Sequence, residues 1–247
     1  MITKEELDSL VKEYETINFI KDDPIQIPHR FKNEEDVTIS AFVTSCFAYG
    51  NRKVFINKLN ELFNKINNKP YEYVINFEPK KLKDFSYRFS KDVDVVCFFN
   101  KLHELYKNGS CLKKLFKQNY NGDIQSMMQA VCDYFYHGCI LTQGYCHLVP
   151  NPQKGCAMKR MSMFLRWMTR KPPVDFGIWD FIPLSELVIP LDTHVARMSR
   201  SLGLLERSSN DFKAVRELTD TLKQFDVTDP VKYDFALFGY GVTHKNL

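Results

Sequence analysis

Hydrophobic residues recur at intervals of three and four along most of the chain, which is the spacing of amphipathic helices. Leu7, Leu10, Val11 and Tyr14 show this spacing near the N-terminus. Similar stretches predict long helices over residues 5–19, 34–48, 52–66, 93–107, 124–140, 192–202 and 212–222, a short helix over 179–187, and a last helix that begins at residue 230. Residues 69–91 are less regular, with a short extended piece predicted over 71–77. The pattern therefore predicts an all-α protein.

Glycine and polar residues mark where several of these helices begin and end. Gly50 suits the end of the second helix, because glycine readily adopts a left-handed conformation. Asn51 suits the N-cap of the third helix, because its side chain accepts hydrogen bonds from free backbone N–H groups. Gly203 is expected to end the helix that starts at Asp192, and residues 209–211, Ser-Asn-Asp, are expected to cap the next one.

Composition narrows the class of protein further. The chain has 247 residues, of which 44% are hydrophobic and 26% are charged, so we expect one globular, two-lobed helical domain over 1–247 with a cleft between the lobes. No apolar run approaches the roughly 20 residues that a membrane span requires, and the N-terminus lacks the apolar core of a signal peptide. We therefore expect a cytoplasmic monomer without a membrane partner.

The seven cysteines are scattered and odd in number, which favours reduced thiols. Cys132, Cys139 and Cys146 recur every seven residues, which suggests a metal site with His137 or His147. Close ligand pairs such as C-x-x-C are missing, however. Seven-residue spacing also places small side chains on one buried stripe of a helix, and this is the interpretation we favour. No metal site is predicted.

Positive charge is concentrated in residues 154–171, which contain six cations and no Asp or Glu, although the net charge of the whole chain is only +4. On a helix, Lys159, Arg166 and Arg170 fall on one face. The opposite face is apolar and consists of Met161, Phe164, Leu165 and Met168. A stripe of one sign suits a polyanion such as DNA, because each neutralised phosphate releases counterions. Taken alone, an ordinary basic helix explains the stripe equally well.

Turn-forming residues precede this helix. Pro150, Pro152 and Gly155 favour a tight backbone turn, in which Gly155 can adopt a positive φ. Backbone N–H groups exposed in such a turn can bind a DNA phosphate without reading the base sequence. An ordinary loop before a helix is the alternative.

The turn resembles the hairpin of the helix-hairpin-helix DNA glycosylases. That hairpin runs Leu-Pro-Gly-Val-Gly and is followed two residues later by lysine in enzymes with lyase activity, whereas residues 153–159 read Gln-Lys-Gly-Cys-Ala-Met-Lys. Gly155 matches the first glycine and Ala157 replaces the second. Lys159 takes the position of the nucleophilic lysine.

A second motif carries the resemblance further. Residues 190–197, Pro-Leu-Asp-Thr-His-Val-Ala-Arg, are similar to Val-Asp-Thr-His-Val-x-Arg of the same superfamily, and Asp192 takes the position of its essential aspartate. Residues 40–50 look like the helix that ends in Ser-Ala-Gln in relatives of endonuclease III, with Tyr49 in place of Gln. The long insertion over 171–189 is more similar to the archaeal 8-oxoguanine glycosylase branch, and the chain also resembles an uncharacterised bacterial family of this superfamily.

The resemblance implies a two-lobed glycosylase-like fold, with its helix-hairpin-helix and catalytic segment at about 150–200, and an enzyme that excises an oxidised purine, expected to be 8-oxoguanine. Lys159 would attack C1′ of a nucleotide extruded from damaged double-stranded DNA, and Asp192 would stabilise the cationic sugar. The residues expected to contact DNA are Gly155, Ala157, Arg160, Arg166 and Arg170. Those expected to form a base pocket are Tyr49, Phe47 and Trp179.

No cofactor is expected. Some relatives of endonuclease III end in a four-cysteine iron–sulfur loop, whereas residues 148–247 of this chain contain only Cys156.

Two other hypotheses remain open. A non-catalytic DNA-binding protein would use the same hairpin, and a monofunctional glycosylase for another lesion would use Lys159 only to contact DNA. Asp192 also suits an ordinary N-cap, which is compatible with catalysis because the cap would orient the carboxylate. Only the lysine-dependent glycosylase requires Lys159 and Asp192 to converge at one site.

Overall fold

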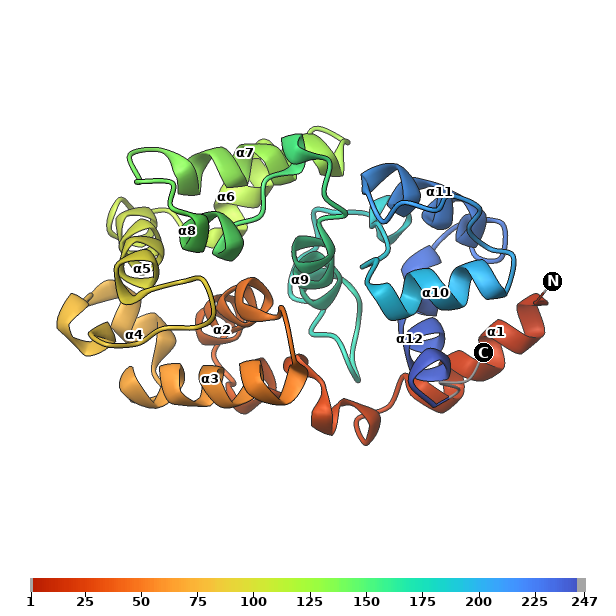
Figure 1. Ribbon diagram of the computed structural model, residues 1–247, viewed down its shortest axis with the longest axis horizontal. Helices are drawn as coiled ribbons and strands as arrows, with labels where there is room; N and C mark the ends of the chain where they lie inside the picture. Colours follow the sequence, from red (N-terminus) through yellow and green to blue (C-terminus); the bar gives the residue numbers. More distant parts are fainter. Residues whose placement is uncertain (1, 244–247) are drawn as a thin grey trace. The chain divides into compact units, whose positions relative to one another are not determined.

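The computed structural model describes residues 2–243. Within them the protein is helical, with no β-strand and two isolated β-bridges, so the predicted all-α class is confirmed. The contacts divide the chain into two compact units (Figure 1). Unit 1 combines the chain up to Asp22, Gly122–Ile124 and the chain from Pro152 on, and unit 2 consists of Asp23–Asn121 and Gln125–Asn151. No helix in this part of the chain is long and apolar enough to cross a membrane.

Unit 2 is built around one buried helix and an aromatic core. Its α-helices are α2 (Glu34–Phe47), α3 (Arg52–Lys65), α4 (Pro70–Ile75), α5 (Asp92–Lys107), α6 (Leu112–Asn119), α7 (Ile124–Tyr136) and α8 (Gln143–Leu148), and its 3-10 helices are η2 (Pro24–Gln26), η3 (Pro28–Arg30) and η4 (Pro79–Leu82). Helix α2 is buried from Val37 through Phe47. Phe42 stacks on Phe98 with ring centres 5.8 Å apart and contacts Phe135 at 5.2 Å.

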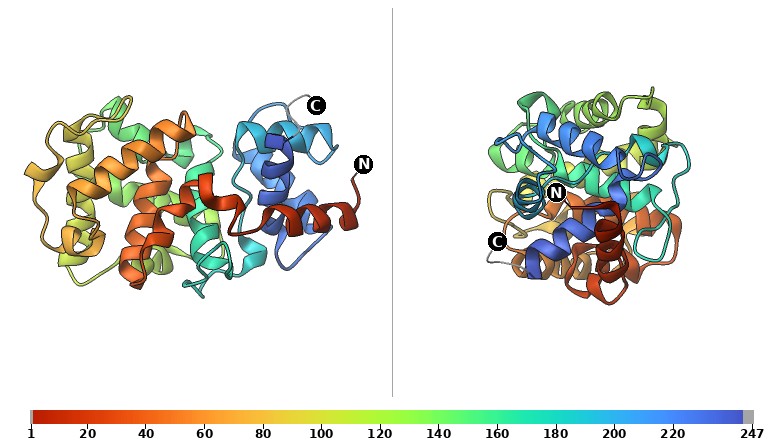
Figure 2. Two further views of the ribbon diagram at one scale, coloured as in Figure 1. Left: turned by 90° about the horizontal axis from the view of Figure 1, so that it is seen from below. Right: turned by 90° about the vertical axis from the view of Figure 1, so that its right-hand side faces the viewer.

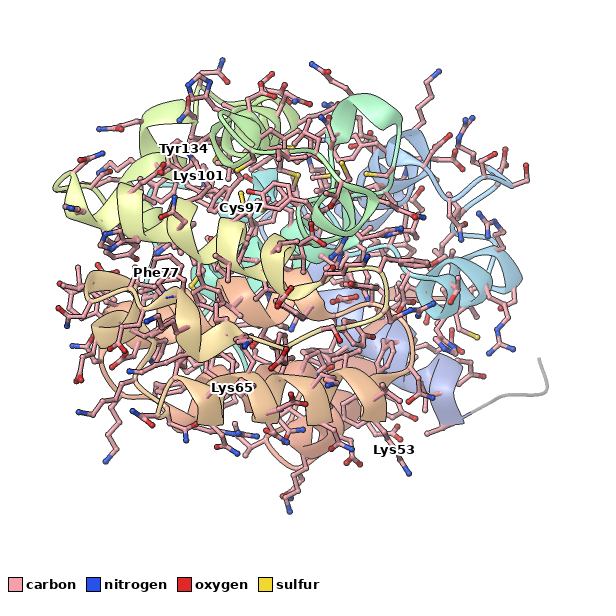
Figure 3. All side chains as sticks on the ribbon, turned by 60° about the vertical axis from the view of Figure 1, so that its left-hand side comes forward. Lys53, Lys65, Phe77, Cys97, Lys101 and Tyr134 are labelled. Carbon is pink, nitrogen blue, oxygen red and sulfur yellow. The ribbon has the colours of Figure 1, made fainter. Side chains whose placement is uncertain are left out.

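The junction between α2 and α3 has the predicted N-cap, whereas Gly50 lies beyond the end of α2, whose C-cap is Ala48. Gly50 has φ +85, and the Asn51 side chain accepts a hydrogen bond from the Val54 N–H at 3.3 Å. Figure 3 shows Lys53 and Lys65 near the two ends of α3. The local sequence is therefore sufficient to separate these two helices.

Unit 1 contains the segment that carries both motifs. Its α-helices are α1 (Lys4–Tyr14), α9 (Lys159–Thr169), α10 (Thr193–Ser201), α11 (Phe212–Lys223) and α12 (Asp234–Thr243), and its 3-10 helices are η1 (Phe19–Asp22), η5 (Pro152–Lys154), η6 (Leu184–Glu186) and η7 (Pro230–Tyr233). Helix α9 is buried on all sides from Met161 through Thr169. It is therefore a central helix of the unit, and the predicted burial of its apolar residues is confirmed.

Helix α12 packs closely against both α10 and α1 (Figure 2). A Cβ atom on Gly241 would lie 2.5 Å from Met198 of α10, and one on Gly239 would lie 2.3 Å from the Tyr14 ring of α1. Both distances are shorter than side-chain carbons tolerate, so only glycine permits these approaches. The N-terminal helix is thereby fixed against the last helix of the chain.

Two sequence predictions are wrong. Residues 71–77 are not extended, because Pro70 starts α4 and the buried face of that helix packs against α5. Residues 179–187 form no α-helix and only the short η6. In that region the N–H of Trp179 donates to the carbonyl of Met168 at 2.8 Å, so the segment satisfies the free carbonyl end of α9.

The three evenly spaced cysteines do not share one helix, which corrects the predicted stripe. Cys132 is buried on α7, which ends at Tyr136, and Cys146 lies on α8. Cys139 lies between these helices, with its Sγ atom 2.6 Å from Sγ of Cys97 on α5. Helix α7 ends before the seven-residue spacing can continue along it.

Candidate active site

Lys159 and Asp192 come from different helices of unit 1 and converge. Lys159 is the first residue of α9, and Asp192 is the N-cap of α10. The Nζ atom of Lys159 lies 3.6 Å from Oδ2 of Asp192, and the two side chains are 34% and 16% exposed. An amine and a carboxylate therefore share a partly exposed site that a ligand can reach from solvent.

The first turn of α10 holds the Asp192 carboxylate in place. Oδ1 accepts hydrogen bonds from the backbone N–H groups of His194 and Val195, both at 2.8 Å. These bonds satisfy two of the N–H groups that lack partners at a helix start, where the helix dipole also favours negative charge. Oδ1 is thus used for orientation, while Oδ2 is the oxygen next to Lys159.

The backbone before α9 forms a tight turn. The N–H of Gly155 donates to the carbonyl of Pro152 at 2.9 Å, and Gly155 is exposed with φ +70. The second left-handed residue is Met158, with φ +50, and not Ala157, which replaces the second glycine of the resembled hairpin. The turn therefore differs in backbone detail from that hairpin, yet it still delivers Lys159 to the start of a helix.

Arg166 lies inside unit 1 and does not face solvent. It is 2% exposed, and its Nη2 atom lies 2.9 Å from Oδ1 of Asp175. Its Nη1 atom forms a second ion pair with Asp234 of α12. The guanidinium also lies over the ring of Phe235, with Cζ 4.2 Å from the ring centre.

Arg170 is buried in the same network and is 7% exposed. Its Nη1 atom lies 2.9 Å from Oδ2 of Asp175, and its Nε atom lies 2.9 Å from Oδ2 of Asp229. Nη1 also pairs with Glu15, the residue that follows α1. The prediction that Arg166 and Arg170 contact DNA is therefore wrong, because carboxylates from other segments already occupy both guanidinium groups.

Asp234 links this network to the candidate catalytic pair. Asp234 is the first residue of α12, and it is 8% exposed. Burial raises the pKa of Asp234 to about 6, against the lowering effect of the Arg166 charge. The negative charge of Asp192 raises this pKa further and the positive charge of Lys159 lowers it. The charge of Asp234 therefore acts on the same site as Lys159 and Asp192.

Two of the three predicted base-pocket residues belong to the cores of their units. Phe47 is 0% exposed, with its ring 6.0 Å from that of Phe85. Trp179 is 2% exposed and meets Phe164 edge to face at 5.2 Å. Neither ring has a face on which a base can stack, so these two assignments are wrong. Tyr49 is only half-buried and remains a candidate.

Sequence reasoning missed Asp175 and Asp234. The available signal was the position of Arg166 within an otherwise apolar stretch of α9, since an arginine buried on a central helix requires carboxylate partners. Asp234 lies far from the basic segment in sequence, and Asp175 lies in the insertion that follows that segment. Contacts of Gly155, Ala157 and Arg160 with DNA stay predictions.

Comparison with known proteins places the chain in a family without assigning it an activity. The family model described as a protein of unknown function (DUF2400) matches residues 23–243, and the chain belongs to this family. No curated protein matches the chain. No solved structure matches it either.

Proposed function

We propose that this protein is a DNA glycosylase with lyase activity, which uses Lys159 as the nucleophile and Asp192 as the charged partner of the sugar. The proposal includes the helix-hairpin-helix superfamily fold, with units 1 and 2 as its two lobes, and an oxidised purine, 8-oxoguanine, as the substrate base. The observation that carries it is the 3.6 Å approach of Lys159 Nζ to Asp192 Oδ2 in a partly exposed site. A non-catalytic hairpin protein has no need for that convergence.

The chemistry begins with loss of a proton from the Lys159 ammonium group, after which the amine attacks C1′ of the nucleotide. The bond between C1′ and the base nitrogen breaks, and the base leaves with the bonding electrons and takes up a proton. Opening of the sugar ring then yields an imine between C1′ and Nζ. Removal of a C2′ proton expels the 3′ phosphate, and water releases the enzyme from the imine.

Asp192 meets the charge requirement of this reaction. Positive charge develops on the sugar as the base leaves, and a carboxylate that is already oriented needs no rearrangement to stabilise it. The two N–H groups at the start of α10 provide that orientation. Its Oδ2 atom lies 3.6 Å from Nζ of Lys159, so the carboxylate is next to the atom that would attack C1′.

Borohydride trapping tests the proposal. Wild-type protein incubated with borohydride and a labelled duplex that contains 8-oxoguanine should become covalently attached, because borohydride reduces the imine. Lys159→Gln should abolish trapping while it leaves duplex binding within about 3-fold. Lys171→Gln is the matched control, since Lys171 is an exposed lysine just beyond the same helix. Its trapping should equal that of the wild type.

Asp192→Asn separates the roles of the pair. Asparagine retains most of the capping capacity but loses the charge, so excision should fall by about 100-fold or more while stability changes by no more than about 1 kcal/mol. Retained excision in both variants would overturn the mechanism. Excision that is lost in Asp192→Asn but kept in Lys159→Gln would instead assign a monofunctional, water-using glycosylase.

A further inference from the structure

Three segments of unit 2 meet around a turn formed by residues 87–90. The N–H and carbonyl groups of Tyr87 and Ser90 bond to each other in both directions at 2.9 Å. The hydroxyl of Ser90 donates to the carbonyl of Gly144 at 2.9 Å, and the Tyr49 hydroxyl lies 3.1 Å from that of Ser90. The turn is therefore tied both to the end of α2 and to α8.

A glycine of α8 makes this approach feasible. A Cβ atom on Gly144 would lie 2.3 Å from the Phe89 carbonyl oxygen and 2.8 Å from Cα of Ser90. Both atoms belong to the backbone and cannot move without shifting the turn. The close contact of the turn with α8 thus requires glycine at position 144.

Inside this frame, three rings form a stack beside a cation. The His147 ring lies 4.4 Å from that of Phe89 and 5.9 Å from that of Tyr49, with interplanar angles of 17° and 20°. The Arg88 guanidinium carbon lies 5.5 Å from the centre of the Phe89 ring and 5.9 Å from that of Tyr49. The four side chains, Tyr49, Arg88, Phe89 and His147, are named the Phe89 platform.

The platform is partly exposed to solvent, unlike the aromatic clusters in the core of unit 2. Phe89 is 44% exposed although His147 covers part of its ring, and Arg88 is also exposed. Arg88 forms no ion pair with a carboxylate anywhere in residues 2–243. It also has φ +52, a left-handed conformation that residues with a side chain rarely adopt.

We propose that the Phe89 platform binds an unpaired nucleobase of a DNA strand, with Arg88 on an adjacent phosphate. A flat, partly exposed aromatic surface suits a base because every base has a π face, and a guanidinium without a carboxylate partner suits a phosphate. A DNA strand supplies both groups at neighbouring positions. The choice of DNA as the polymer rests on the proposed function, whereas the stacking surface itself does not.

Binding of two single-stranded probes isolates the stacking contribution. The first probe is a fluorescein-labelled oligothymidylate, and the second is an oligonucleotide of equal length whose sugars carry no bases. Wild-type protein should bind the first about 10-fold more tightly by fluorescence anisotropy, which corresponds to one stacked base. Phe89→Leu should remove this preference, and Phe89→Trp should retain it. Equal binding of both probes by the wild type would overturn the proposal.

Controls address the fold and the charge. Tyr71→Leu changes another exposed aromatic of unit 2, which packs on Tyr106 outside the platform, and should leave the preference intact. Arg88→Ala should reduce the slope of log affinity against log salt by about 0.7, the value for one phosphate contact on a single strand. Equal loss of preference in Tyr71→Leu and Phe89→Leu, or an unchanged slope in Arg88→Ala, would contradict the platform.

A second readout separates this proposal from the proposed function. Borohydride trapping on a duplex with an abasic site requires Lys159 but no base. If wild type and Phe89→Leu are both trapped while neither distinguishes the two probes, the platform is wrong and the enzyme assignment stands. If neither protein is trapped but the wild type still prefers the oligothymidylate, the enzyme assignment is wrong and the platform stands.

Discussion

Replacing Arg166 with methionine tests whether its side chain is part of the protein interior or a DNA contact. The side chain is 2% exposed and donates from Nε and Nη2 to Asp175, at 3.2 and 2.9 Å, and from Nη1 to Asp234. Methionine fills a similar volume but provides no charge. Asp175 keeps its ion pair with Arg170 at 2.9 Å, whereas Asp234 loses its ion pair with Arg166.

The expected cost follows from the loss of one partner of a buried ion pair. Such a loss destabilises a protein by about 3–5 kcal/mol, since the remaining charge is left buried without compensation. For an m-value of about 2.5 kcal/mol per molar urea, the unfolding midpoint should fall by about 1–2 M at pH 7. The loss should be smaller at pH 5, because the Asp234 carboxyl, with a pKa of about 6, can then take up a proton.

Tryptophan fluorescence is the suitable assay. The chain has two tryptophans, Trp167 and Trp179, and both are buried in unit 1, so their emission reports the unfolding of that unit. Lys171→Met is the matched control, an exposed cation of the same basic segment that should change stability by less than about 0.5 kcal/mol. An Arg166→Met protein with unchanged stability and weaker duplex binding would refute the reasoning and restore the DNA contact.

Two further predictions concern titration. Because the pKa of Asp234 is raised from its ordinary 3.8 to about 6 by burial, its contribution to stability is fully present below pH 4 and is lost as the pH rises through 6. The free energy of unfolding of the wild type, measured relative to Asp234→Asn by urea titration, should therefore fall by about 2 kcal/mol between pH 4 and pH 7, and a rise over that range would contradict the assignment. Burial and a hydrogen bond with Cys139 raise the pKa of the Cys97 thiol to about 12, so iodoacetamide should label Cys97 at pH 8 at least about 100-fold more slowly than a free cysteine peptide. Mass spectrometry of the labelled peptides measures this rate, and labelling as fast as the free peptide would show that the pKa of Cys97 is not raised.

The sequence alone determined the helical class and several helix boundaries. The signals that succeeded are local, such as Asn51 at the start of α3, because a cap depends on the backbone within one turn. The Asp192 motif also succeeded in placing a carboxylate at the start of α10. The resemblance of residues 190–197 to a known motif likewise depends only on residues that are adjacent in sequence.

Only the tertiary structure decided which charges are exposed. Helical projection places Lys159 and Arg166 on one face, yet Lys159 reaches a partly exposed site while Arg166 is buried. The carboxylates that decide this come from Asp175 and Asp234, and Asp234 is brought to α9 by packing of the last helix. Periodicity identifies a face but not its neighbours, because those neighbours are set by contacts between segments distant in sequence.

The Phe89 platform is the second feature that the sequence did not indicate. Tyr49, Phe89 and His147 are separated by tens of residues and show no common spacing. They meet because Gly144 allows the turn over 87–90 to approach α8, while the Tyr49 hydroxyl reaches Ser90 of the same turn. One sequence does not show whether a glycine is needed for close packing, because an isolated glycine suits an open loop equally well. The need becomes evident only when the atoms around the position of the missing Cβ are known.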